Sequence, residues 1–206
     1  MKFKLTIFSD YICPWCYVGQ GPVEKLIGEH EVDLDWRPFY LYQNVPDEGM
    51  DLPDYVLQAR MHGSEERLAE IATSYGMKFL STARIYSTRP AHEATEYARN
   101  LGKANEFHKV VFRQVYAEGQ DISHWGVLRA AALEVGLDGD DMQTVVKGGK
   151  HTDNVAGQVD QAYNLGVSGV PTYVFNNRYA IVGAQPYEVF LKAIARLRAD
   201  LEGQSS

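Results

Sequence analysis

The pattern of apolar and polar residues predicts two strands near the start of the chain. Residues 3–8 are largely apolar, and residues 32–39 alternate apolar with polar positions, as a strand with one buried face does. The segment between them has helical composition, and we expect one helix that runs to about Gly28 with a kink near Pro22. Strand, helix and strand at this spacing predict a right-handed crossover between parallel strands.

The long central part of the chain carries apolar residues at helical spacing. We expect a short helix that opens at Asp51-Leu52-Pro53, followed by six longer ones. Ser64 and Ser123 are typical N-cap residues, and we expect each of them to begin a helix. The longer helices are expected near residues 64–76, 90–102, 107–119, 123–136, 140–146 and 155–166.

Strand signals return only near the end of the chain. Thr172–Phe175 and Tyr179–Val182 flank Asn176-Asn177-Arg178, whose asparagines tolerate positive φ, so these residues predict a hairpin. Pro186 then opens a last amphipathic helix.

The order of elements is βαβ, a helical block and ββα, which predicts an α/β protein with one mixed sheet. The first and last parts of the chain have to meet in that sheet. We therefore expect residues 1–45 and 166–206 to form one domain, with residues 46–165 as a large all-helical insertion beside it.

Composition and charge exclude several classes of partner. The chain has 206 residues, of which 45% are apolar, enough for the core of a single globular domain. Its net charge is −7 and its Lys and Arg residues are scattered, so we expect neither nucleic acid nor an anionic bilayer as a partner. No apolar run is long enough to span a membrane, and the first residues do not resemble a secretory signal. We expect a cytoplasmic protein, and the sequence does not specify its oligomeric state.

The chemistry of the sequence is concentrated in Cys13-Pro14-Trp15-Cys16, which contains both of its cysteines. Pro14 suits the first position of a helix, which makes Cys13 the N-cap. A sulfur at that position would face the unpaired amides of the first turn, which favour a thiolate. We therefore expect Cys13 to be an exposed nucleophile and Cys16, deeper on the same face, to resolve a mixed disulfide.

Three other interpretations of this pair remain. A zinc site needs about four ligands, and the six histidines include no pair at short spacing. A structural disulfide that encloses two residues would add little stability, because the gain grows with loop length. The two residues could also be inert buried thiols. The proline and the helix start favour the redox pair, and no metal site is expected.

A second motif precedes the hairpin. Pro171 stands at the start of a strand that should be central in the sheet. One interpretation is a cis Val170–Pro171 bond, which would present the Val170 backbone as an unpaired edge for an extended substrate. The other is an ordinary trans proline at the end of a loop, and the residues alone favour neither.

Together these motifs resemble the DsbA-like proteins of the thioredoxin superfamily, and the resemblance covers nearly the whole chain. It extends to the FrnE-like branch, which is grouped with 2-hydroxychromene-2-carboxylate isomerases and kappa-class glutathione transferases. Residues 8–19 resemble the N-terminal signature of that branch, and residues 112–122 resemble its insertion motif. Residues 87–92 resemble a third motif that ends in Ala-His, with Ser87 where asparagine is common.

The resemblance implies a thioredoxin-like fold and roles for particular residues. Cys13 corresponds to the nucleophile, Cys16 to the resolving thiol, and Pro171 to a cis proline that faces them. Pro14 and Trp15 complete the active-site motif. Trp15 stands where periplasmic DsbA proteins carry histidine, and a neutral indole does not stabilise a thiolate by charge. We therefore expect a less oxidising couple than that of DsbA, within the roughly −270 to −120 mV that such couples span.

Three functions compete. The first is a thiol–disulfide oxidoreductase that acts on protein or small-molecule disulfides, with no bound cofactor and with glutathione as a candidate co-substrate. The second is a glutathione-dependent isomerase or transferase of a small aromatic substrate. Since a serine commonly replaces the first cysteine in the resembling enzymes of that kind, Cys13 favours the first function. The third is a holdase or scaffold with a vestigial redox pair.

Candidate substrate contacts come from the same motifs and from nearby aromatic residues. Val170, Pro171, Tyr11 and His92 are the predicted contacts, although His92 also suits an exposed helix start. Asp10 is either a buried proton acceptor for Cys16 or a solvated residue at a strand end. The aromatic residues either line an apolar cleft or pack in the core; they are Tyr11, Trp15, Tyr17, Trp36, Phe39 and Tyr40.

Overall fold

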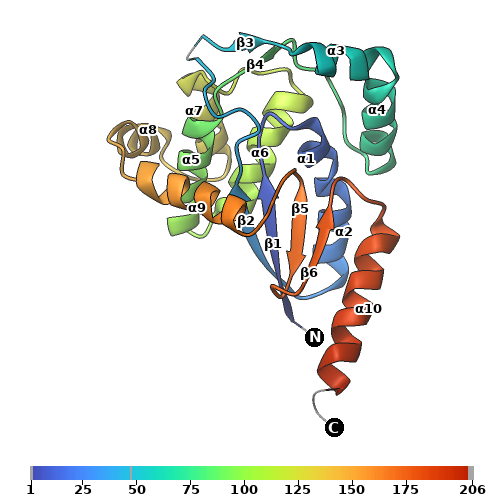
Figure 1. Cartoon of the computed structure of the whole chain (residues 1–206). Coiled ribbons are helices and arrows are strands. Elements are labelled where there is room, and N and C mark those ends of the chain that lie inside the picture. Colours follow the sequence, from blue (N-terminus) through green and yellow to red (C-terminus); the bar gives the residue numbers. More distant parts are fainter. Residues whose placement is uncertain (1, 47, 204–206) are drawn as a thin grey trace.

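A four-stranded sheet in the order β2-β1-β5-β6 joins the two ends of the chain (Figure 1). The computed structural model describes residues 2–46 and 48–203. β1 pairs in parallel with β2 and antiparallel with β5, and β5 and β6 form the hairpin. Asn176 and Asn177 have φ of 47° and 55° in its turn, as predicted. The strands are β1 (Phe3–Ser9), β2 (Val32–Pro38), β5 (Thr172–Phe175) and β6 (Tyr179–Val182).

The predicted first helix is divided in two. α1 (Pro14–Val18) ends at Gly19, and α2 (Gln20–Glu29) begins directly after it. The predicted kink at Pro22 is wrong, because Pro22 lies in the first turn of α2, where a missing N–H leaves no bond unmade. The division falls at Gly19 instead, where β5 approaches closely. The Tyr173 hydroxyl donates to the Gly19 carbonyl oxygen at 3.1 Å.

Gly19→Ala is expected to destabilise the protein by about 1–3 kcal/mol, the usual cost of overpacking. A Cβ at this position would lie 2.1 Å from the Tyr173 hydroxyl and 2.9 Å from the Trp15 carbonyl oxygen. Urea unfolding measures the effect. Gly28→Ala in α2 is the matched control, since nothing lies within 4 Å of its Cβ and a helical alanine should stabilise by up to about 1 kcal/mol. Equal midpoints for the two variants would contradict the close packing of β5 against Gly19.

The segment between β2 and β5 is mostly helical, as predicted, with local differences. The N-cap of α4 is Gly63 rather than Ser64, and that of α7 is His124 rather than Ser123. The Ser123 hydroxyl instead donates to Asp121 at 2.7 Å. The sequence did not predict a short antiparallel pair, β3 (Met50–Asp51) and β4 (Arg84–Ile85). The helices are α3 (Asp54–Met61), α4 (Ser64–Ser74), α5 (Arg89–Asn100), α6 (Ala104–Tyr116), α7 (Trp125–Glu134), α8 (Gly139–Lys147), α9 (Thr152–Asn164) and, after the hairpin, α10 (Tyr187–Gly203).

Two main apolar clusters hold these parts together. In the first, the inward face of β1 packs against α2 and α10; its largest contributors include Phe3, Leu5, Ile7, Leu26, Phe175, Phe190 and Ile194. The second lies among α4 to α8 and includes both cysteines. The cysteines are therefore part of the contact between the sheet and the helical segment. Figure 1 shows α1 between the sheet and the helices of that segment.

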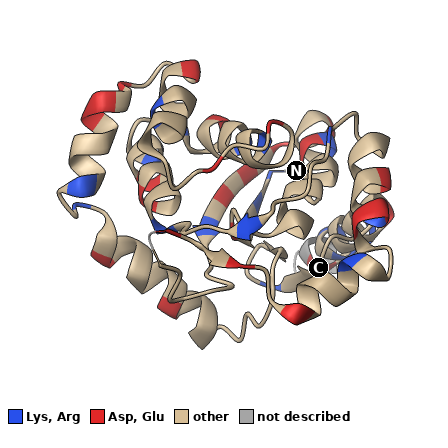
Figure 2. Cartoon of the chain, turned by 90° about the horizontal axis from the view of Figure 1, so that it is seen from above, with Lys and Arg blue, Asp and Glu red and all other residues tan. Residues whose placement is uncertain are grey.

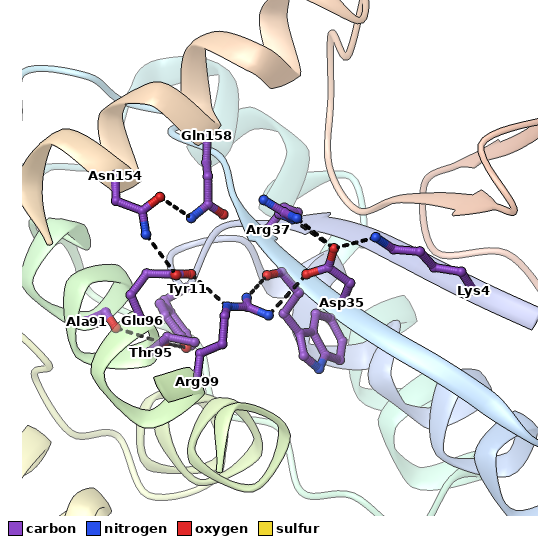
Figure 3. A network of polar contacts seen from close by, with 11 residues as sticks. Lys4, Tyr11, Asp35, Arg37, Ala91, Thr95, Glu96, Arg99, Asn154 and Gln158 are labelled. Carbon is purple, nitrogen blue, oxygen red and sulfur yellow. Dashed lines mark hydrogen bonds and ion pairs between the residues drawn. The ribbon is translucent and has the colours of Figure 1, made fainter. Parts of the chain in front are cut away.

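A partly buried polar network ties α5 to the sheet (Figure 3). The Arg99 guanidinium contacts Asp35 of β2 and Glu96 of its own helix, each at 3.0 Å, and also donates to the Trp36 carbonyl oxygen. Asp35 is further paired with Lys4 at 3.1 Å and Arg37 at 2.9 Å. Burial alone would raise the pKa of Asp35, but the hydrogen bond and charge of Arg37, together with Lys4 and Arg99, hold it below its usual value.

Charges of both signs are distributed over all parts of the fold (Figure 2). Lys and Arg alternate with Asp and Glu on helices and strands instead of gathering on one side. Across the described residues, every helix is too short or too polar to cross a bilayer.

Candidate active site

The two cysteines lie where β1 leaves the sheet and α1 begins. Cys13 is the N-cap of α1 and Pro14 its first residue, which confirms the prediction. The Cys13 amide donates to the Asp10 carbonyl oxygen at 3.0 Å, and the Cys13 carbonyl oxygen accepts from the Cys16 amide at 3.0 Å. The turn brings Cys16 back toward Cys13, and both residues are free thiols.

The Cys13 sulfur lies beside the segment that leads into β5. Its thiol donates to the Val170 carbonyl oxygen at a Sγ–O distance of 3.6 Å. The Val170–Pro171 bond is cis, which confirms that interpretation. The amides expected to face the sulfur are not its partners, since the first turn of α1 shows no side-chain capping bond. The motif at 13–16 and the motif at 170–171 are therefore in direct contact.

The prediction that Cys13 is exposed is wrong. Only 3% of the residue is accessible, because α3, α4 and the loops beside them cover this end of the sheet. Cys13 instead lines a cavity of about 440 Å³ together with Pro14, Trp15 and Val170. The rest of the wall is mostly apolar and includes Leu41, Leu52, Val56, Leu68, Phe79 and Ile85. This cavity gives a substrate access to the sulfur, and its volume suits a small organic molecule or one large side chain.

Cys16 lies behind Cys13 and is not among the residues that line the cavity. Burial raises the pKa of the Cys16 thiol well above its usual value, and the neighbouring Cys13 sulfur raises it further. The Ser9 hydroxyl and the Asp10 backbone lie close enough to oppose this shift. Cys16 is therefore held as a thiol until a base takes its proton.

Three of the four predicted substrate contacts do not line the cavity. Tyr11 is fully buried, and its hydroxyl makes a 2.5 Å hydrogen bond with Thr95. His92 is 5% exposed, so it is neither a contact at the mouth nor a surface residue. Both side chains are buried because α5 packs over the end of β1. Of the other two, Val170 lines the cavity, whereas Pro171 is buried behind it.

Asp10 is buried, contrary to the interpretation of a solvated strand end. The residue is 1% exposed, and its carboxylate accepts from the Leu41 amide at 2.8 Å. The His92 Nε2 atom lies 3.5 Å from its other oxygen. The carboxylate is buried and the Asp10 backbone lies close to the Cys16 thiol, so Asp10 remains the candidate proton acceptor.

The aromatic wall of the cavity comes from residues that the sequence did not single out. Most of the aromatic residues considered beforehand pack in the core, among them Tyr17, Trp36 and Phe39. The cavity is instead lined by Tyr42, Tyr55, Phe79 and Tyr116, besides Trp15. The one available signal was that Tyr116 lies within the insertion motif at residues 112–122.

A larger hollow of about 580 Å³ lies over the face of the sheet that points away from α2 and α10. Its polar wall includes Lys4, Asp35 and Arg37, and neither cysteine lines it. The smaller cavity is therefore the one that gives a ligand access to sulfur.

Comparison with known proteins gives one family and several relatives. Residues 4–195 match the family model described as DSBA-like thioredoxin domain. The uncharacterized protein YwbO of Bacillus subtilis (strain 168) is 28% identical over 196 residues, which are 95% of this chain and 97% of that protein. A 2-hydroxychromene-2-carboxylate isomerase of Sphingobium xenophagum is 23% identical over 183 residues, 83% of this chain and 88% of the isomerase. Among solved structures, the probable DsbA oxidoreductase SCO1869 of Streptomyces coelicolor has a TM-score of 0.84 at 25% identity, covering 94% of this chain and 89% of that one.

Proposed function

Because this chain belongs to the DsbA-like thioredoxin family, we propose that it is a thiol–disulfide oxidoreductase that works through Cys13 and Cys16. The observation that carries the proposal is the unequal placement of the two sulfurs. Cys13 lines the cavity, whereas Cys16 lies behind it with a raised pKa. Such a pair suits one thiol that meets the substrate and one that acts later.

The proposed exchange has two steps. The Cys13 thiolate attacks one sulfur of a substrate disulfide, so a mixed disulfide forms and the other substrate sulfur leaves as a thiolate. Cys16 then loses its proton, with Asp10 as the candidate acceptor, and attacks the Cys13 sulfur. The bound half of the substrate leaves as a second thiolate. The substrate gains two electrons, and the protein ends with a Cys13–Cys16 disulfide.

Glutathione is the proposed co-substrate that restores the dithiol. Two glutathione molecules would each contribute one electron and together form oxidised glutathione. A cytoplasmic setting, where glutathione and thioredoxin keep thiols reduced, is part of this proposal. Other low-molecular-weight thiols could carry out the same exchange.

An insulin-reduction assay with glutathione as the reductant tests the proposed class of activity. We expect the wild-type protein to accelerate insulin precipitation, and a Cys13→Ser, Cys16→Ser double variant to match the reaction without protein. The second candidate function, a glutathione-dependent transferase or isomerase, is favoured by the aromatic wall of the cavity and by the isomerase relative. Conjugation of glutathione to 1-chloro-2,4-dinitrobenzene by the double variant, without insulin reduction by the wild type, would favour that function instead.

The Cys13–Cys16 couple is expected to be less oxidising than that of DsbA, with a potential below about −120 mV. Trp15 supplies no charge to stabilise a thiolate, and burial raises the pKa of the Cys16 thiol. Equilibration with glutathione buffers, followed by mass spectrometry of the alkylated protein, measures this potential.

Trp15→His is the matched variant for this prediction. An imidazolium beside Cys13 stabilises the thiolate of the reduced form, so the potential of this variant should rise. A wild-type value at or above about −120 mV, or a lower value in Trp15→His, would contradict the argument.

A further inference from the structure

One of the residues that line the cavity has a buried hydroxyl without a hydrogen-bond partner. Tyr116, the last residue of α6, is 1% exposed, and among the described residues nothing pairs with its Oη atom. A buried polar group without a partner is unfavourable, and each one in a folded protein calls for a reason.

The Tyr116 ring is held firmly in place. It stacks on Tyr17 and Phe79 at centroid distances of 5.1 and 6.0 Å, and it lies 6.2 Å from Phe112. The Tyr116 carbonyl oxygen also accepts from the Leu80 amide at 2.6 Å. The hydroxyl therefore cannot swing away to find a partner elsewhere.

Tyr116 and Cys13 line the same cavity. Its charged residues already have partners, because Arg60 pairs with Glu65 at 2.7 Å and donates to the Thr82 carbonyl oxygen at 2.7 Å. Burial, together with the charges of the nearby Cys13 and Cys16, raises the pKa of Tyr116 well above its usual value. The hydroxyl remains protonated and keeps its O–H available as a donor.

We propose that the Tyr116 hydroxyl donates a hydrogen bond to the substrate in this cavity, so that the protein prefers thiols and disulfides whose apolar, aromatic body carries a neutral acceptor. A carbonyl oxygen or a ring nitrogen fits this description. An anionic acceptor fits poorly, because it would enter an apolar cavity beside a sulfur that has to become a thiolate. This inference rests on the proposed function and deepens it, since it assigns a specificity-determining residue and a substrate class to the same site.

The test compares wild-type protein with Tyr116→Phe on two disulfides of nearly equal shape. Bis(acetylphenyl) disulfide carries a carbonyl oxygen where bis(isopropylphenyl) disulfide carries a methyl group, and meta and para isomers of both are used. We expect Tyr116→Phe to lower kcat/KM about tenfold for the better acetyl isomer through a higher KM, and less than twofold for the isopropyl compounds. Because each comparison is made on one compound, differences in intrinsic reactivity cancel.

The unfolding midpoint separates this role from a structural one. Phenylalanine fits the same aromatic stack and removes the unpaired hydroxyl, so Tyr116→Phe should unfold at the same or a higher urea concentration. A lower midpoint, or equal kcat/KM ratios for the acetyl and isopropyl compounds, would overturn the inference.

A binding measurement keeps this test independent of the proposed function. 4-Acetylthioanisole and 4-isopropylthioanisole contain no exchangeable sulfur and probe the cavity by calorimetry. If wild-type protein reduces neither these disulfides nor insulin, the proposed function fails. In that case the binding data alone decide the role of Tyr116. The role holds if the acetyl compound binds more tightly to the wild type than to Tyr116→Phe while the isopropyl compound binds both proteins equally, and it fails otherwise.

Discussion

Replacing Cys13 by serine is expected to lower the rate of insulin reduction by at least about a thousandfold. Cys13 is the cysteine that lines the cavity, and a hydroxyl at the same place is a far weaker nucleophile toward sulfur. Cys16 cannot take over, because it lies behind the cavity wall with a raised pKa. The change from sulfur to oxygen is small, so the unfolding midpoint of the variant should stay close to that of the wild type.

Cys16→Ser is the matched control, since it makes the same chemical change at the deeper position. This variant should still attack a disulfide but cannot resolve the product. A mixed disulfide with the substrate or with glutathione should therefore accumulate, and intact-protein mass spectrometry detects it. Substantial insulin reduction by Cys13→Ser, or trapping at Cys16 in place of Cys13, would show that the roles of the two sulfurs are wrongly assigned.

The buried carboxylate of Asp10 offers a finer version of the same experiment. If Asp10 accepts the proton of Cys16, Asp10→Asn should slow only the second step. The mixed disulfide would then accumulate transiently in Asp10→Asn. No such accumulation is expected if Asp10→Asn resolves the mixed disulfide as fast as the wild type does. Unchanged resolution would leave Asp10 with a purely structural role toward Leu41 and His92.

The parts of the site that the sequence predicted correctly are those that local geometry determines. Pro14 fixes the start of α1 and with it the N-cap position of Cys13, because a proline at the first helical position sets φ and needs no amide bond. The hairpin turn was predictable from Asn176 and Asn177 for the same kind of reason. Val170–Pro171 lies between these cases, since the residues left cis and trans equally favoured and the family resemblance decided for cis.

The features of the site that the sequence did not predict depend on contacts between segments far apart in the chain, and no local sequence pattern contains that information. Tyr11 and His92 suited a cleft in the sequence, yet both are buried where α5, which carries His92, packs against Tyr11. Cys13 is enclosed by helices that begin forty or more residues later. Tyr116 was missed because its helix was interpreted only as an apolar stripe, and a hydroxyl without a partner is visible only in three dimensions. Similarly, Gly19 ends α1 because Tyr173 packs against it from the other end of the chain.

The attachment of the helical segment to the sheet should depend strongly on Arg99, and Arg99→Ala is expected to destabilise the protein by about 3 kcal/mol. Without the guanidinium, Glu96, which is 4% exposed, keeps its 3.1 Å hydrogen bond from the Asn154 side-chain amide but loses its ion pair. The substitution also removes one of the three cations around Asp35. Urea unfolding at pH 7 measures the effect. Arg129→Ala is the matched control, because Arg129 pairs with the exposed Asp140 and should contribute less than about 1 kcal/mol.

The pH dependence of the stability difference between wild type and Arg99→Ala tests whether the charge of Arg99 causes that difference. Burial would raise the pKa of Asp35, yet Arg37, Lys4 and Arg99 together hold it below its usual value in the folded protein. Ionised Asp35 therefore stabilises the fold above its unfolded pKa of about 3.9, and this contribution is lost as the pH falls through the lower folded value. Protonation of Asp35 also removes a charge that Arg99 pairs with, so the difference in unfolding free energy between wild type and Arg99→Ala should narrow from pH 6 to pH 3. A difference that stays constant over this range would mean that Arg99 stabilises the protein through the packing of its aliphatic stem, and that the network does not depend on ionised Asp35.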